Sequence, residues 1–360
     1  MKSARTKKKS SIHDLEAQVA RKVVSESLGL KNGDSVTVET WNNGFELASK
    51  FVLEARKVGA HPVMIFEDED IYVESVKITP KDSLGKMGKH EYELLSASDA
   101  YFFIPNEALE GYTNRLSPSE VDQATSYGTS WYDAAEKAKL KGARMSFGFA
   151  GKELAKILGK KLDEVVIHQL KATLADFATI SKIGKELGAR LPNGTLGTID
   201  SDGAQLEFEF DDGLRIEDGI VDESDVANGY NMAYLPPGSL SKYVKPASVN
   251  GTVKLSPTFT QRGIISGVVL EFEKGDLVKW SSTRSSQERL DSLINTQPES
   301  QRKLEAVIIG LNPLLRYGYG QDRFVMGSIG ISGLDFTGIV RKGTLRAGED
   351  LLVQNGKVQS

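Results

Sequence analysis

The sequence predicts an α/β protein of two domains, a Rossmann-like N-terminal domain and an α+β C-terminal domain with a largely antiparallel sheet. Three observations support this. A length of 360 residues allows two sizeable cores. In the first half, strand, helix and strand patterns follow one another within about thirty residues, which is typical of a parallel βαβ unit. In the second half, residues 204–211 alternate strictly between apolar and polar side chains, as in a strand with one buried face.

The N-terminal half contains helix and strand signals in alternation. Apolar residues at helical spacing follow Ser11, and Gly29 closes this first helix. Gly59 ends the second helix, after which a short apolar run forms a buried strand. The expected elements after the first helix are strands near 36–38, 62–66, 100–104 and 144–149, and helices over 44–58 and 132–141.

The C-terminal half has a different pattern. A long helical stretch over 163–191 is expected to link the two halves, and turn dipeptides at Asp202-Gly203 and Asp212-Gly213 bracket the alternating strand. Further strands are expected at 251–255, 264–272 and 277–280, with helices near 286–294 and 300–306. The predicted organisation is a basic disordered tail (1–11), a Rossmann-like domain (12–162) and a helical linker with the α+β domain (163–360).

Composition excludes several classes of protein. The chain has no cysteine, so it has no disulfide, no cysteine nucleophile and no thiolate metal site. No run approaches the roughly 18 apolar residues of a membrane span, and Met1–Ser11 lacks the apolar core of a secretory signal. These features favour a cytoplasmic protein.

Charge is distributed unevenly. Five basic residues lie among the first eleven, which leaves 40 basic against 49 acidic side chains in the rest of the chain. A body with a net negative charge argues against a broad nucleic-acid-binding face. Contact with a nucleic acid or another anion is therefore expected only through the tail, at Lys7, Lys8 and Lys9.

Several segments resemble the aminopeptidase T-type family of metalloaminopeptidases. Residues 28–40 and 52–66 are similar to its opening strand, helix and strand. In the second half five landmarks keep the family's order: Tyr234–Gly238 (YLPPG), Val249–Val253 (VNGTV), Ile309–Pro313 (IGLNP), Gly327–Ile329 (GSI) and Asn355–Lys357 (NGK). The resemblance implies a Rossmann-like domain, a C-terminal catalytic domain and a homodimer. It also implies two divalent metals that activate a water molecule for cleavage of the N-terminal peptide bond.

Most metal-ligating positions of that family hold other residues here. The glutamate expected after Leu-Pro-x-Gly falls on Ser239, and the Asp-Glu pair before the Gly-Thr-Ile-His motif reads Asp322-Arg323. The histidine of that motif falls on Gly330, and the histidine of the late His-x-Asp motif falls on Gly333. A fixed positive charge at Arg323 would repel divalent metals. The resemblance therefore predicts a dismantled metal site.

Three acidic remnants lie at or near family positions. Asp322 and Asp335 match them, and Glu305 sits one residue out of register with the glutamate that precedes the Asn-Pro turn. The four histidines end at His168, so the second half has no imidazole, and any site there is all-oxygen and suited to magnesium or calcium. The three acids are either a weak site for a hard cation or plain surface carboxylates.

The sequence thus predicts an aminopeptidase T-like protein that is catalytically inactive and acts in binding or regulation. No cofactor is expected, and its partner is an unidentified protein or small molecule. The alternative is a divergent metal-dependent aminopeptidase or hydrolase with a carboxylate-only site and a weakly held divalent cation.

Overall fold

The computed structural model describes residues 2–105, 115–145, 150–260, 263–295, 297–334 and 336–359, with only the backbone at 2–11, 118, 121–123 and 125. The chain forms two compact units. Unit 1 comprises residues 1–174 and 219–236, and unit 2 comprises residues 175–218 and 237–360. The chain therefore passes between the units three times, where the sequence suggested a single boundary near residue 162.

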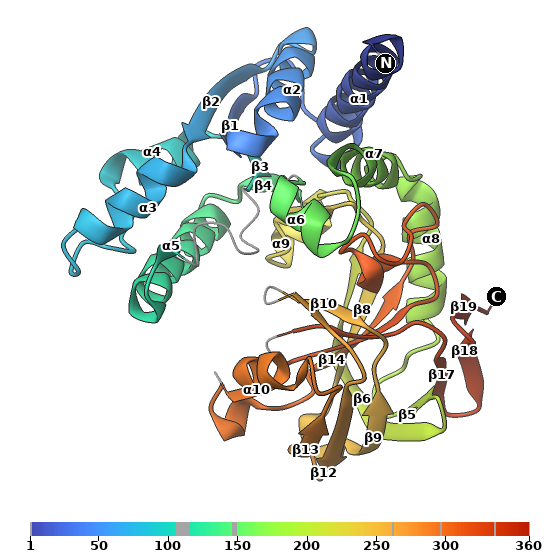
Figure 1. Ribbon diagram of the computed structural model, residues 1–360. Coiled ribbons are helices and arrows are strands. Elements are labelled where there is room, and N and C mark those ends of the chain that lie inside the picture. The colour runs from blue at the N-terminus through green and yellow to red at the C-terminus, as the bar shows by residue number, and fades with distance from the viewer. Residues whose placement is uncertain are drawn as a thin grey trace. The chain divides into compact units, whose positions relative to one another are not determined.

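Unit 1 is built on a five-stranded parallel sheet in the order β2-β1-β3-β4-β7 (Figure 1). The expected Rossmann-like domain is thus confirmed. Its elements are α1 (Lys2–Lys22), a π-helical turn (Val23–Ser27), β1 (Ser35–Trp41), α2 (Phe45–Lys57), β2 (His61–Glu67), α3 (Glu69–Ile78), α4 (Lys89–Ala97), β3 (Ala100–Ile104), α5 (Pro118–Lys137), β4 (Lys141–Met145), α6 (Lys152–Ile157), α7 (Leu162–Thr173), α9 (Glu223–Ala227) and β7 (Met232–Leu235).

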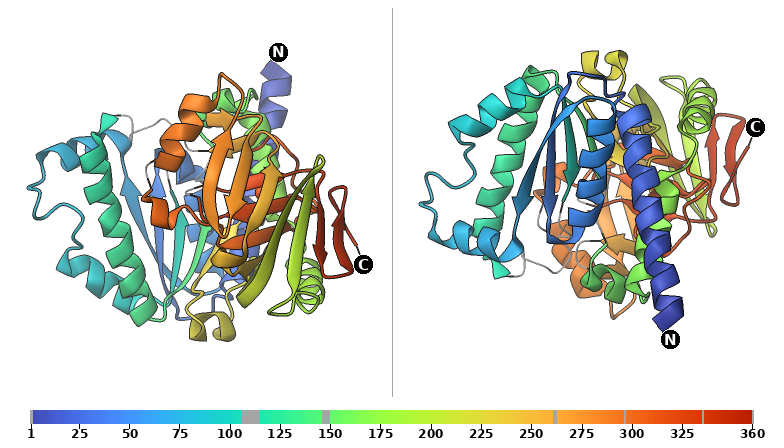
Figure 2. Two further views of the ribbon diagram at one scale, coloured as in Figure 1. Left: turned by 90° about the horizontal axis from the view of Figure 1, so that it is seen from below. Right: turned by 90° about the horizontal axis from the view of Figure 1, so that it is seen from above.

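Helices cover both faces of this sheet, and the two layers differ. On one face α1 packs against α2 and α7, and the ring of Phe51 from α2 stacks on Phe102 of β3 at a centroid distance of 4.2 Å. On the other face lie α3, α4 and α5, of which α5 contacts both α3 and α4 (Figure 2). Side chains alternate along each strand, so β1 directs Val36 and Val38 to the first layer and Thr37 and Glu39 to the second.

Unit 2 contains a 12-stranded sheet whose ladders are all antiparallel, which confirms the expected α+β domain. In β6 the alternating residues Leu206, Phe208 and Phe210 are fully buried. The helix α8 packs over β6 and β8, where Gly184 and Gly188 leave room for Ile216 and Leu214. The elements are α8 (Phe177–Gly188), β5 (Leu196–Ser201), β6 (Ala204–Glu217), β8 (Ser239–Val244), β9 (Asn250–Lys254), β10 (Thr258–Thr260), β11 (Gly263–Ile265), β12 (Val269–Glu273), β13 (Asp276–Ser281), α10 (Gln287–Asn295), β14 (Ala306–Gly310), β15 (Ile329–Ser332), β16 (Gly338–Val340), β17 (Thr344–Ala347), β18 (Asp350–Gln354) and β19 (Lys357–Val358).

The helical stretch expected over 163–191 is present, but it is interrupted. The chain forms two helices there, α7 and α8, and α8 begins after Asp176, whose carboxylate accepts a hydrogen bond from the Thr179 hydroxyl. An aspartate at this position favours a helix start over helix continuation. The break falls where the chain leaves unit 1 for unit 2.

Three other boundaries also differ. The strand expected to end near residue 211 continues as β6 to Glu217. Asp212-Gly213 forms a bulge within the strand instead of a turn, with a φ of +94° at Gly213. The strand expected over 264–272 is divided at Gly267, and residues 306–310 form β14 where a helix end was expected. The strand expected over 144–149 begins earlier, at Lys141, and residues 146–149 lie outside the described part of the chain.

The first helix begins at Lys2, within the segment that the sequence assigns to a disordered tail. The side chains of Lys7, Lys8 and Lys9 lie outside the described residues, so their expected contacts with anions stay a prediction. Among the described residues, no helix has the length and apolar character needed to span a bilayer.

Candidate functional site

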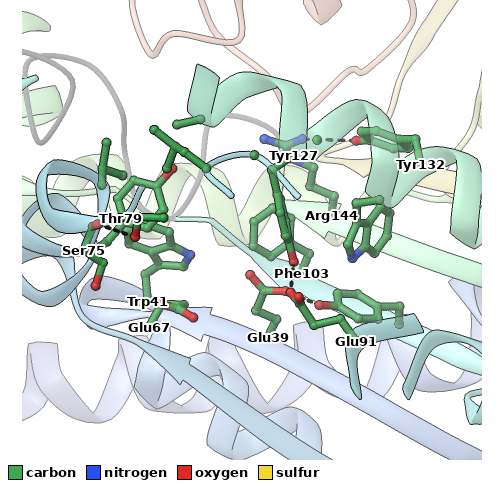
Figure 3. A pocket seen from close by; sticks show the side chains of 18 of the residues that line it. Glu39, Trp41, Glu67, Ser75, Thr79, Glu91, Phe103, Tyr127, Tyr132 and Arg144 are labelled. Carbon is green, nitrogen blue, oxygen red and sulfur yellow. Dashed lines mark hydrogen bonds between the residues drawn. The ribbon is translucent and has the colours of Figure 1, made fainter. Parts of the chain in front are cut away.

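A cavity of about 520 Å³ lies in unit 1 on the sheet face that α3, α4 and α5 cover (Figure 3). Its volume is within the range of small-molecule sites in proteins. We call it the unit 1 cavity. Its lining residues are Glu39, Trp41, Glu67, Tyr72, Ser75, Val76, Thr79, Leu84, Gly85, Glu91, Tyr101, Phe103, Leu116, Ala124, Tyr127, Gly128, Trp131, Tyr132, Arg144 and Met232.

Side chains of the strands β1, β3 and β4 form the floor of the cavity. Glu39 and Trp41 are two residues apart on β1, and Tyr101 and Phe103 are two residues apart on the neighbouring β3. Glu39 pairs in register with Phe103, and Phe103 pairs with Arg144 of β4. Because side chains at every second position of a strand share a face, these five residues point to the same side of the sheet.

Helix α5 supplies the opposite wall. Ala124, Tyr127, Gly128 and Trp131 are spaced as on one face of a helix, and all four line the cavity. The start of α5 is fixed by Ser117, whose backbone N–H donates to a Glu120 carboxylate oxygen at 2.6 Å. This capping fixes where the helix begins. The contact of the Trp131 ring with Tyr101 of β3 shows that this face of the helix is turned towards the sheet.

Two of the cavity's carboxylates are held by tyrosine hydroxyl groups. Tyr101 donates a hydrogen bond to Glu39, and Tyr127 donates one to Glu91. Glu91 also accepts the backbone N–H of Gly88 at the start of α4, which fixes its direction. Figure 3 shows Glu39 and Glu91 close together in the cavity wall.

The third carboxylate, Glu67, ends β2 and also lines the cavity. Its pKa is raised above the ordinary value by burial and by the nearby charge of Glu91. Burial, with the charges of Glu67 and Glu91, raises the pKa of Glu39 to about 7, although the Tyr101 hydroxyl and Arg144 oppose this shift. We therefore expect Glu39 to be partly protonated near neutral pH.

Aromatic rings form much of the remaining wall. The ring centroids of Trp41 and Tyr72 lie 5.1 Å apart, and those of Tyr101 and Trp131 lie 5.0 Å apart in an edge-to-face arrangement. The guanidinium carbon of Arg144 lies 5.1 Å from the centroid of Phe103, and its Nη1 donates to the Tyr132 hydroxyl at 3.3 Å. The cavity thus combines apolar, π-rich walls with carboxylates, which suits recognition of a small organic molecule.

The sequence-predicted site residues lie elsewhere, in unit 2. Asp322 is 3% exposed, and its carboxylate accepts the Arg341 guanidinium at 2.7 Å and the backbone N–H of Gly318 at 2.7 Å. Glu305 is exposed next to β14. Ser239 is buried and opens β8, while Arg323 lies with its guanidinium carbon 4.6 Å from the Phe324 ring centroid.

The two glycines at family histidine positions are tightly enclosed. A Cβ atom built at Gly330 would lie 3.0 Å from Ile308 Cβ. One built at Gly333, where φ is +119°, would lie 2.3 Å from the carbonyl oxygen of Lys303. Asp335 lies outside the described residues. Among the residues that are described, no three His, Asp or Glu side chains gather as a metal site would require.

Several motif segments of the resemblance meet in unit 2. The backbone N–H of Leu311 donates to Gly238 O at 2.7 Å, and Asn312 Nδ2 donates to Pro237 O at 2.7 Å. Gly327 donates its N–H to Gly310 O at 2.9 Å. The YLPPG, IGLNP and GSI segments are therefore joined by hydrogen bonds, and in this chain these bonds hold three separate stretches of backbone together.

Comparison with solved structures identifies the fold. AmpT from Thermus thermophilus aligns with a TM-score of 0.66 at 14% sequence identity, over 96% of this chain and 99% of that one. A 2,5-dihydroxypyridine dioxygenase from Pseudomonas putida KT2440 aligns with a TM-score of 0.60 at 12% identity, over 97% of each chain. No protein-family model and no curated protein matches the sequence.

The chain therefore has the AmpT-like, aminopeptidase T-type fold over nearly its whole length, as the sequence resemblance predicted. The names of the two matched proteins describe different reactions. A shared fold at this level of identity does not assign a reaction, so function must be argued from the sites of this chain.

Proposed function

We propose that this protein is a catalytically inactive member of the AmpT-like fold that acts by binding a ligand rather than by cleaving peptides. The observation that carries the proposal is the ion pair between Asp322 and Arg341, at 2.7 Å. Asp322 is the aspartate that stands at a metal-ligating position of the aminopeptidase T-type resemblance. A carboxylate that already neutralises an arginine is a poor ligand for a divalent metal.

The neighbouring positions support the same conclusion. Gly330 and Gly333, which stand where the family has histidines, are packed so closely that a side chain would meet Ile308 or the Lys303 carbonyl oxygen. Arg323 adds a second positive charge beside Asp322. These residues do not fit a pair of divalent metals, because such a site needs several carboxylates or imidazoles that converge on each ion.

An aminopeptidase assay tests the proposal. The full-length protein would be incubated with a panel of aminoacyl-p-nitroanilides, with added Co²⁺, Zn²⁺ or Mg²⁺ and after treatment with a chelator. We expect no release of nitroaniline above the blank in any condition. Metal-dependent turnover that the chelator abolishes, and that Asp322→Asn also abolishes, would instead support the divergent hydrolase.

A further inference from the structure

We propose that the unit 1 cavity binds a small organic cation, a molecule with an ammonium or guanidinium group on a compact apolar body. The inference deepens the proposed function by naming the class of ligand. Apart from Glu39, the lining residues named above lie outside the segments that resemble the aminopeptidase T-type family. It rests on the volume of the cavity, its aromatic walls and the charges that line it.

The volume and the walls define the body of the ligand. About 520 Å³ holds a molecule of one or two rings. Trp41, Tyr72, Phe103 and Trp131 present ring faces and edges, which stabilise apolar groups by burial. Ring faces also attract a cation, because the π-system carries negative charge above its plane.

The charges define the polar group of the ligand. Among the described residues that line the cavity are three carboxylates, Glu39, Glu67 and Glu91, and one guanidinium, Arg144. Arg144 already donates to the Tyr132 hydroxyl and stacks on Phe103. The lining is thus unbalanced towards negative charge, and a bound cation would relieve the mutual repulsion of the carboxylates.

Glu67 offers a carboxylate that is not engaged by a tyrosine hydroxyl in the described part of the chain. Glu39 and Glu91 each accept a tyrosine hydroxyl, whereas no described side chain donates a hydrogen bond to Glu67. An ammonium group near Glu67 would form a charge-assisted hydrogen bond in a partly desolvated position. A neutral molecule of the same shape lacks this interaction, and an anion would be repelled.

Binding can be measured by intrinsic fluorescence. The chain has three tryptophans, of which Trp41 and Trp131 line the cavity and Trp280 lies in unit 2. In a Trp280→Phe background the emission therefore comes from the cavity walls alone. The cationic probes are 2-phenylethylamine, phenyltrimethylammonium and benzylguanidine. The neutral and anionic controls of similar size are 2-phenylethanol and phenylacetate.

Two variants locate the site, each with a matched control. Gly128 lines the cavity from α5, and a Cβ atom built there meets no described atom within 4 Å, so Gly128→Leu places its side chain into the space of the cavity. Thr129→Leu changes the next, exposed position of the same helix. Glu67→Gln removes one cavity charge, and Glu74→Gln removes an exposed charge on α3.

We expect at least one cation to bind at least about tenfold more tightly than 2-phenylethanol, the difference of one charge-assisted contact. Gly128→Leu should abolish this binding, Glu67→Gln should weaken it about tenfold, and the two controls should retain it. Binding of none of the cations, or equal or tighter binding of the alcohol or the acid, would overturn the inference. Unchanged binding in Gly128→Leu would overturn the assigned position. None of these outcomes depends on the aminopeptidase assay, so the two proposals can fail separately.

Discussion

The hydroxyl group of Tyr101 donates a hydrogen bond to the carboxylate of Glu39 across two neighbouring parallel strands, β3 and β1. Burial and two nearby glutamates raise the pKa of Glu39 to about 7, and this hydrogen bond opposes the rise. We therefore expect the buried carboxyl group of Glu39 to change its charge near neutral pH.

The first prediction concerns this hydrogen bond. Tyr101→Phe removes the donor that stabilises the ionised form of Glu39, so the pKa of Glu39 should rise further above 7. The measurement is a pH titration of the ¹³C chemical shift of the Glu39 carboxyl carbon. Tyr132→Phe is the control, because Tyr132 donates no hydrogen bond to Glu39 within the described residues. An unchanged or lower midpoint in Tyr101→Phe would contradict the assignment.

The second prediction concerns stability and pH. The folded protein keeps a proton on Glu39 between the ordinary pKa of 4.5 and about 7, whereas the unfolded chain loses it. The free energy of unfolding should therefore fall as pH rises through this window. Glu39→Gln removes this titration. Between pH 5 and pH 8 the free energy of unfolding of the wild type should therefore fall by about 1–3 kcal/mol more than that of the variant.

Urea denaturation at the two pH values measures this difference. Glu16 of α1, whose pKa is also raised to about 7 by burial beside Glu46, contributes in the same direction and remains in the variant. Glu74→Gln, an exposed change, should follow the wild-type curve. A Glu39→Gln variant that also follows that curve would show that Glu39 ionises normally.

The third prediction concerns ligand binding and pH. Phenyltrimethylammonium keeps its charge at every pH, so only the protein titrates. Its affinity for the unit 1 cavity should rise by up to about tenfold from pH 6 to pH 8, as Glu39 loses its proton. Glu67 and Glu91 add to the attraction, and Arg144 opposes it. Isothermal titration calorimetry measures the affinity, and Glu39→Gln should flatten the profile.

The fourth prediction concerns the buried ion pair in unit 2. Asp322→Ala leaves Arg341 without its carboxylate and the Gly318 N–H without its acceptor, so it should lower the free energy of unfolding by about 2–4 kcal/mol. Asp276→Ala, which removes an exposed carboxylate paired with Lys303, should lower it by less than about 1 kcal/mol. Similar losses in the two variants would contradict a structural role for Asp322.

The fifth prediction concerns Gly333. Alanine there would place a Cβ atom 2.3 Å from the Lys303 carbonyl oxygen at a φ of +119°. Gly333→Ala should therefore destabilise the protein by about 2–3 kcal/mol. Gly128→Ala, in a helix with open space around it, should be neutral or stabilising. Thermal or urea denaturation of both variants provides the comparison.

The sequence predicted most of the parallel sheet because its strands are apolar runs between clear helix signals. Residues 100–104 were predicted with the observed bounds, and Gly59 marked the end of α2 as expected. The antiparallel strand β6 followed from its alternation. The helix break at Asp176 and the bulge at Gly213 were not predicted. An aspartate or a glycine fits several local conformations, and packing against other elements selects the helix start at Asp176 and the bulge at Gly213.

The unit 1 cavity could not be predicted from residue spacing. Glu39 and Glu91 are more than fifty residues apart, and parallel register together with the capping of α4 brings them close. One signal was present in the sequence, namely a glutamate inside the strand 35–41, whose residues after Ser35 are otherwise valine, threonine and tryptophan. Whether this glutamate lines a cavity depends on which helices cover that face of the sheet. One of these helices, α5, was predicted only from residue 132, although it begins at Pro118.

The parallel sheet of unit 1 has a consequence for synthesis. Its fifth strand, β7, comes from residues 232–235 and pairs with β4, although the strands β5 and β6 of unit 2 are made in between. A nascent chain that has left the ribosome only as far as residue 174 would leave one edge of β4 without its neighbour. Such an edge invites pairing with other chains. Translation must therefore pass the whole of β6 and reach Leu235 before β4 gains its neighbouring strand.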